Sequence, residues 1–335
     1  MESFWRKKTL LAYVLAVLVF IIHISTLDCF VPLAQQPFLK GFVSSVCRCA
    51  VPTFLVISGA LFFRNYDNSQ YGKKMKSRAK SLLVPYLAWN TIGMLYAFAK
   101  TLLPAAYVHD KTPFDPTFVN VLLAIFHNAE NFPFWFIFNL IVFFIFAPLV
   151  YVLLKNRILG IFVILGVLTT TALGYGLPVS VFTQPESVVY FLTGAYIGLH
   201  GFKEFSTRSV SKTRIGILGV TACVLSRLFV PAVVTSLFVS TLLLAVYAVC
   251  LVFAFDVFPY DRPVRKFCEH SFFVYVMHFQ VCVVVSRLTF LALPNGLCLN
   301  YLLTIVITLV LIEITAQLLK KYTPMLYNVL SGSRG

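Results

Sequence analysis

Charged residues are scarce in this sequence. They make up 12% of its 335 residues, whereas hydrophobic residues make up 59%, and the mean hydropathy is +0.88. A water-soluble domain of this length needs a polar surface that such a composition does not supply. Apolar runs of about twenty residues, each long enough to cross a hydrocarbon core of about 30 Å, recur along the chain. The sequence therefore predicts an all-α polytopic membrane protein.

Signatures of several soluble enzyme classes are missing. The sequence has no G-x-x-x-x-G-K-[ST] phosphate loop, no H-E-x-x-H zinc helix and no G-x-S-x-G nucleophile turn. Its eight cysteines lie in or at the edges of apolar runs. No second pair accompanies Cys47 and Cys49, so no metal site is expected. We expect buried, apolar thiols, and the alternative is an outward-facing disulfide between Cys29 and Cys298.

Acidic residues are also few, because 12 Asp and Glu stand against 27 Lys and Arg, a net charge of +15. Most of the basic residues fall in alternate connecting segments, and the positive-inside rule places those segments and both termini in the cytoplasm. The lipid bilayer, through its anionic headgroups, is the expected partner of this charge, and nucleic acid is not needed. About ten transmembrane helices are predicted in a single domain, 1–335. The predicted spans are 10–30, 42–63, 81–103, 133–154, 158–176, 185–201, 215–229, 232–255, 271–291 and 300–319.

The longest outward segment, 104–132, begins with a proline-rich stretch. Its amphipathic part, Thr117–His127, predicts a short interfacial or re-entrant helix. Glu130 and Trp135 are candidates for substrate binding, since a carboxylate can accept a hydrogen bond from a hydroxyl and an indole can stack on a ring. The alternatives are a solvated loop carboxylate and an interfacial aromatic anchor.

Ionisable residues within the spans are the main functional candidates, because charge at bilayer depth is costly and usually has a partner or a role. A rise of about 1.5 Å per residue places His23, Arg48 and Arg287 at nearly the same level. A histidine can act as general base, and an arginine can bind an anion or stabilise an oxyanion. We therefore predict a reaction centre there, and the alternative for His23 is a structural hydrogen bond between helices. His278 and Glu313 form a second level, either as a proton relay or as a structural hydrogen bond.

Five motifs occur in the order in which one membrane family has them. They are "RCAVPTFLVISGALFF" (48–63), "KSRAKSLLVPYLAWN" (76–90), "FWFIFNLIVFFIFAPLV" (134–150), "YFLTGAYIG" (190–198) and "SFFVYVMHFQV" (271–281). Together they resemble the motifs of the acyltransferase-3 family of integral membrane O-acyltransferases. The resemblance implies a helical bundle in the bacterial inner membrane that uses acyl-CoA as co-substrate and has no bound cofactor. Its implied reaction moves an acyl group, commonly acetyl, to a sugar hydroxyl of an envelope glycan or lipid-linked precursor.

The resemblance also implies roles for individual residues. The family's catalytic first-helix histidine matches His23, and the arginine of its second-helix motif matches Arg48. Its late-helix histidine matches His278, which we assign to substrate binding together with Arg287.

Two family positions differ in this chain. The family's usual histidine before the tryptophan of its L-W-F motif is absent, because Phe134 precedes Trp135 here. The family usually has an arginine eleven residues before the catalytic histidine, and Ala12 occupies that position here. The cations of residues 6–8 lie too far down the first helix to replace it on the same turn. A phosphate is best met by paired or forked donors, so we expect Arg78 and Lys80 to bind acyl-CoA instead.

Two other functions are compatible with the same sequence. A transporter or flippase-like exporter of a glycan or lipid-linked sugar would share the bundle without the chemistry. Paired Gly/Pro-broken helices in corresponding halves, which are typical of inverted-repeat transporters, are not seen. A non-catalytic scaffold for envelope synthesis is the third hypothesis. The sequence does not choose among acceptor sugars, acyl groups or oligomeric states.

Overall fold

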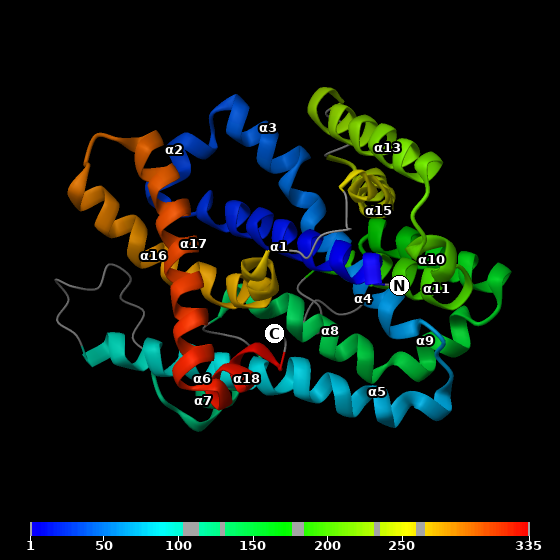
Figure 1. Ribbon diagram of the computed structural model, residues 1–335, viewed down its shortest axis with the longest axis horizontal. Helices are drawn as coiled ribbons and strands as arrows, with labels where there is room; N and C mark the ends of the chain where they lie inside the picture. The colour runs from blue at the N-terminus through cyan, green and yellow to red at the C-terminus, as the bar shows by residue number, and fades with distance from the viewer. Residues whose placement is uncertain are drawn as a thin grey trace.

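The protein is helical throughout the residues that its structure, a computed structural model, describes: 2–102, 114–127, 131–175, 184–230, 235–258 and 265–333. Figure 1 shows α1 running through the middle of the assembly, with the other helices around it. The helices are α1 (Glu2–Ile24), α2 (Val31–Ala34), α3 (Pro37–Ser45), α4 (Ala50–Phe63), α5 (Tyr71–Arg78), α6 (Val84–Leu102), α7 (Phe118–Phe126), α8 (Trp135–Ile145), α9 (Ala147–Leu154), α10 (Arg157–Ala172), α11 (Ser187–His200), α12 (Phe202–Ser206), α13 (Val210–Phe229), α15 (Leu237–Ala254), α16 (Ser271–Ala292), α17 (Leu297–Tyr322) and α18 (Pro324–Ser331).

Six helical segments are long and apolar enough to cross a membrane. They are Phe4–Ile24, Pro37–Phe63, Asn68–Leu102, Leu237–Val257, Lys266–Ala292 and Leu297–Tyr322. The pair α8 and α9 makes a seventh if its two halves form one span, and α10 and α11 are apolar but shorter. A helix therefore coincides with each of the ten predicted spans, including α13 at 215–229. The number that crosses the membrane and the cytoplasmic termini stay predictions.

The predicted span 133–154 is broken rather than continuous. α8 ends at Ile145, α9 begins at Ala147, and their axes differ by 66°. Pro148 stands in the first turn of α9, where its missing N–H costs nothing and its ring prevents the preceding helix from continuing.

The segment "RNYDNSQYGKKMKSRAK" (64–80), which connects two of the predicted spans, is largely helical. Asp67 starts it, since its side chain accepts a hydrogen bond from the backbone N–H of Ser69 at 2.7 Å. Lys74 donates to the backbone oxygens of Phe62 at 2.5 Å and Arg64 at 3.0 Å, so a cation caps the end of α4. A π-helical turn, Ala79–Leu83, joins α5 to α6, and the two helices form one long rod in Figure 1.

The short helix predicted at Thr117–His127 is confirmed as α7. The Thr117 side chain caps it by accepting from the backbone N–H of Asn120 at 3.3 Å. α7 packs along α6, where Tyr86 donates to the backbone oxygen of Phe126 at 2.9 Å and Asn90 donates to that of Ile125 at 3.1 Å. α7 is thus held against the first half of α6.

The helices meet closely where glycine allows it. α4 and α11 pack against each other, and a Cβ atom at Gly194 would overlap the backbone of Val56. α1 in turn contacts both α4 and α16. Glycine is needed at this crossing because any side chain would force the two backbones apart.

A buried ion pair fixes the beginning of α1. Lys7 and Asp256 are 2% and 3% exposed, and their Nζ and Oδ1 atoms lie 2.7 Å apart. Asp256 belongs to the 3₁₀ turn Phe255–Val257 that follows α15. Removing one member would leave an uncompensated buried charge, so the pair holds α1 in a defined rotation about its axis.

Candidate active site

Two histidines from distant parts of the sequence, His23 and His278, lie next to each other in the structure. His23 lies in the last turn of α1, and His278 is fully buried on α16. Their ring centroids are 5.2 Å apart. Phe20 and Phe279 flank the pair, with Phe20 5.8 Å from His278 and Phe279 5.9 Å from His23. This His23–His278 pair is therefore enclosed by aromatic rings.

The segment Asn131–Phe134 holds α16 on both sides of His278. Tyr275, one turn before the histidine, donates its hydroxyl hydrogen bond to the backbone oxygen of Pro133. Gln280, two residues after it, donates to Oδ1 of Asn131 at 2.5 Å. Asn131 in turn donates to the backbone oxygen of Trp89 at 2.9 Å. The position of the histidine is thus determined by bonds to a neighbouring segment as well as by its own helix.

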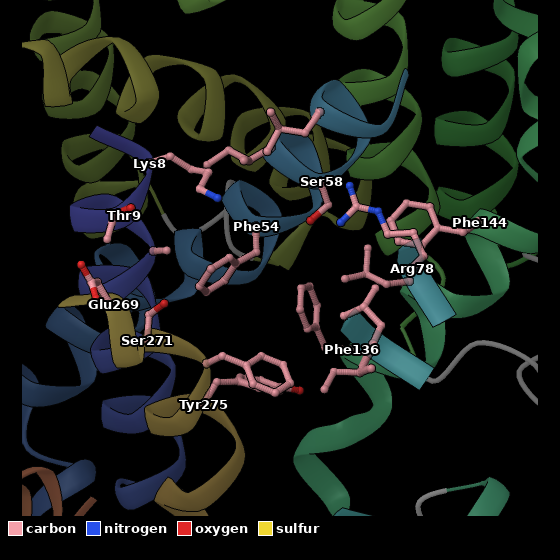
Figure 2. Close-up of a pocket in the computed structure, with 17 residues that line it drawn as sticks. Lys8, Thr9, Phe54, Ser58, Arg78, Phe136, Phe144, Glu269, Ser271 and Tyr275 are labelled. Carbon is pink, nitrogen blue, oxygen red and sulfur yellow. The ribbon is translucent and has the colours of Figure 1, made fainter. Parts of the chain in front are cut away.

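A cavity of about 550 Å³ adjoins this region. Residues of α1, α4, α8 and α16 and of the α5–π-turn segment line it. In Figure 2 the Lys8 ammonium and the Arg78 guanidinium lie on either side of its upper part, next to Ser58. Tyr275 lies at the other end, with its ring centroid 6.1 Å from that of His278. The cavity therefore joins a cationic end to the neighbourhood of the His23–His278 pair.

Of the two residues expected to bind acyl-CoA, one lines the cavity and the other does not. Arg78 lines the cavity, and its guanidinium lies over the rings of Phe144 and Phe62, at 5.3 and 5.9 Å, a cation–π arrangement. Lys80 is exposed and is not among the lining residues.

Lys8 is the cation that the sequence analysis set aside as too far from Ala12. The structure shows that both residues line the same cavity, because positions i and i+4 of a helix share a face. Lys8 can therefore serve the end of the cavity at which the usual arginine is missing.

Neither of the two remaining arginines of the predicted centre lines the cavity. Arg48, in the 3₁₀ turn Cys47–Cys49 that packs against α1, is exposed, and its charge interacts with that of Arg227. Arg287 is also exposed, and its charge interacts electrostatically with the thiol of Cys29. It is nine residues beyond His278 on α16, hence roughly 14 Å along the axis. The predicted common level of His23 and Arg287 is therefore wrong.

Arg227 was missed from the sequence, although a basic residue inside the apolar run 215–229 was a signal for it. Its side chain is 4% exposed. Nε donates to the backbone oxygen of Ser44 at 2.9 Å, and Nη1 donates to Oγ of Ser240 at 3.0 Å. The arginine ties α13 to α3 and α15.

The proposed pairing of His278 with Glu313 is also wrong. Oε2 of Glu313 lies 2.8 Å from Nδ1 of His270. Oε1 of Glu313 accepts a hydrogen bond from Nε2 of Gln317 at 2.6 Å. Both carboxylate oxygens are thus engaged, whereas Nδ1 of His278 is bonded to backbone oxygens of its own helix. The error arose because the sequence places residues along a helix but does not say which helix each side chain faces.

Trp135 and Glu130 are the remaining substrate-binding candidates. Trp135 opens α8, is partly buried, and meets Phe136 edge-on with ring centroids 6.3 Å apart. Glu130 lies outside the described residues. The eight cysteines are free, so the alternative of a disulfide between Cys29 and Cys298 is not realised.

These observations define a class of protein: a helical, multi-pass membrane protein with a buried histidine pair beside a partly cationic cavity. The chain belongs to the acyltransferase-3 family, because that family's model, which describes an acyltransferase domain, matches residues 10–316. The resemblance seen in the five motifs is thereby confirmed.

A curated relative extends the comparison. The succinoglycan biosynthesis protein ExoH of Rhizobium meliloti (strain 1021) is 29% identical over 161 residues, which are 47% of this chain. The match spans 42% of that relative's own length. No solved structure is significantly similar to this chain.

Proposed function

We propose that this protein is a membrane-bound O-acyltransferase of the bacterial inner membrane. It moves an acyl group, acetyl in the first instance, from acyl-CoA to a sugar hydroxyl of an envelope glycan or a lipid-linked precursor. Membership of the acyltransferase-3 family supports the reaction class, and the relative that takes part in succinoglycan biosynthesis supports a polysaccharide acceptor. The observation that carries the proposal is the cavity leading from Lys8 and Arg78 to Tyr275, beside the His23–His278 pair.

The cavity suits the chemistry of the donor. Phosphates of CoA would lie at the end with Lys8 and Arg78, where a guanidinium supplies forked donors and an ammonium adds a point charge. The middle is lined by apolar side chains such as Phe54 and Phe136, which suit the uncharged part of the pantetheine arm and the acyl group. Its volume falls within the range of about 300–1,000 Å³ usual for ligand sites.

The His23–His278 pair suits the chemistry of the acceptor. His23 takes the proton of the sugar hydroxyl while the hydroxyl oxygen attacks the thioester carbonyl carbon. The carbon–sulfur bond then breaks, and the departing CoA thiolate receives that proton from His23. Arg48, whose turn packs against α1, is the proposed stabiliser of the charge that develops on the carbonyl oxygen.

Acyl transfer in proteoliposomes tests this function. Labelled acetyl-CoA and a membrane glycan extract should give labelled glycan with the wild-type protein and none with His23→Ala. His200→Ala is the matched control, because His200 is bonded to the backbone of Leu154 at 2.8 Å, away from the cavity. Mass spectrometry of envelope glycans, with and without the gene, should show the acyl mass shift in cells. Glycan export without any acyl mass shift would support the transporter instead.

A further inference from the structure

The buried ring of His278 has a defined protonation pattern. Its Nδ1 atom lies 2.7 Å from the backbone oxygen of Tyr275 and 3.2 Å from that of Val274. Both neighbours are hydrogen-bond acceptors only, so Nδ1 must carry the hydrogen. The ring is 0% exposed, and no described carboxylate forms an ion pair with it, so burial favours the neutral form. In a neutral imidazole with the hydrogen on Nδ1, Nε2 holds a lone pair.

This lone pair is next to the proposed catalytic base. Nε2 of His278 is buried and has no hydrogen-bond donor among the described residues. The ring of His23 is 5.2 Å away, centroid to centroid, at an interplanar angle of 38°. An N–H···N bond of ordinary length puts two imidazole centroids roughly 5 Å apart. Hydrogen bonds of this kind are often poorly aligned until the substrate is bound, and the spacing of the two rings is the spacing that such a bond requires.

We propose that His278 is a positioning residue for His23, whose ring N–H donates to Nε2 of His278 during acyl transfer. This inference rests on the proposed function of the preceding section. The bond fixes the tautomer of His23, so that its other nitrogen is unprotonated and available to the acceptor hydroxyl. When His23 takes the hydroxyl proton, its bond to Nε2 becomes charge-assisted and stronger.

The arrangement plays the part that a carboxylate plays beside the base of a catalytic triad, but with a neutral acceptor. A carboxylate would have to be kept ionised in this apolar surrounding, which is costly. His278 avoids that cost because the backbone of its own helix satisfies Nδ1.

Two substitutions separate positioning from a merely structural role. His278→Asn keeps an amide donor near the place of Nδ1, and thus the bond to the Tyr275 backbone, but has no atom at the place of Nε2. His278→Gln puts an amide oxygen near the place of Nε2 and gives up the bond to the backbone. If the histidine only anchors its helix, the Asn variant should behave like the wild type and the Gln variant should be the poorer one.

The proposal predicts the opposite order. We expect the kcat of His278→Asn to fall about 10- to 100-fold, as for other residues that orient a functional histidine, with the KM for acyl-CoA unchanged. His278→Gln should lose less than about tenfold. Phe279→Leu is the control, because Phe279 also contacts the His23 ring but offers no nitrogen. Wild-type kcat in the Asn variant, or an equal loss in both variants with normal folding, would overturn the proposal.

A second measurement does not depend on activity. In ¹⁵N spectra of the histidine-labelled protein in nanodiscs, His278 should show a protonated Nδ1 and an unprotonated Nε2. His23 should show one tautomer in the wild type and a mixture in His278→Asn. A protonated Nε2 on His278, or a His23 tautomer that does not respond to the substitution, would contradict the inference. If acyl transfer is absent even from the wild type, the proposed function fails while these spectra still test the pair.

Discussion

Arg78 is the residue on which the proposed binding of acyl-CoA most directly depends. Its guanidinium lies against two stacked aromatic rings and faces the cavity. A cation held in this way has already lost much of its side-chain freedom, so less conformational entropy remains to be lost when a phosphate binds.

We expect Arg78→Gln to raise the KM for acyl-CoA about tenfold while kcat changes little. Loss of a binding interaction that is equal in ground and transition states affects KM alone. Lys80→Gln is the matched control, since Lys80 lies in the adjoining π-helical turn but is exposed and does not line the cavity. Steady-state kinetics in proteoliposomes measure both variants. Equal shifts in KM for the two would show that only the general basic charge of this segment matters.

For single residues, the sequence showed which side chains are unusual better than it showed which side chains contact one another. His23 and Arg78 were found because a histidine inside a span and an arginine next to one are unusual. Lys8 was missed although positions i and i+4 of a helix share a face. The Glu313–His270 pair was missed because it depends on how the turn before α16 packs against α17, 43 residues further along the chain. Hydropathy gives the depth of a side chain and not its direction.

The backbones of α4 and α11 approach each other closely where these two helices cross. The absence of a side chain at Gly194 allows it. Because α4 also contacts α1, a change in this crossing would move the wall of the cavity.

Gly194→Ala should lower the apparent Tm of the detergent-solubilised protein, because overpacking a close contact costs about 1–3 kcal/mol. Gly166→Ala on α10 is the matched control, since a Cβ atom there meets nothing within 4 Å. That substitution should leave the Tm unchanged or raise it slightly, because alanine is the better helix former. Thermal unfolding followed by fluorescence-detected size exclusion compares the two. An unchanged Tm in Gly194→Ala would mean that α11 can shift without cost.

The sequence predicted a helix accurately where the hydropathy pattern and the capping residue indicate the same boundaries. Thr117 and the amphipathic residues after it gave α7 almost to the residue. α5 was missed because its residues are polar and basic, so that no apolar period marked it, and its stability comes from Lys74 capping α4. The break between α8 and α9 was missed although Pro148 marks it.

At the scale of the whole molecule, the main untested expectation is orientation. Exposed basic residues of α5 belong to the side predicted to face the cytoplasm, and the segment before α7 belongs to the opposite side. The positive-inside rule is the physical reason for this assignment.

Single-cysteine labelling should show the two sides. In a cysteine-free background, Lys76→Cys should react with an impermeant maleimide only after the cells are opened, and Asp115→Cys should react in intact cells. Both positions are exposed, so accessibility to the reagent is not limited by packing. Labelling of Lys76→Cys from outside would reverse the orientation and move the cationic end of the cavity away from cytoplasmic acyl-CoA.

The buried pair of Lys7 and Asp256 also has a consequence for the order of biosynthesis. The two residues are 249 positions apart, so the ribosome, at about 5–20 residues per second, needs roughly 12–50 s between them. During that time α1 has emerged but lacks the partner that sets its rotation, and His278 does not yet exist to meet His23. The His23–His278 pair is therefore completed late in translation, and a nascent chain that stalls before α16 contains the first helix without the proposed active site.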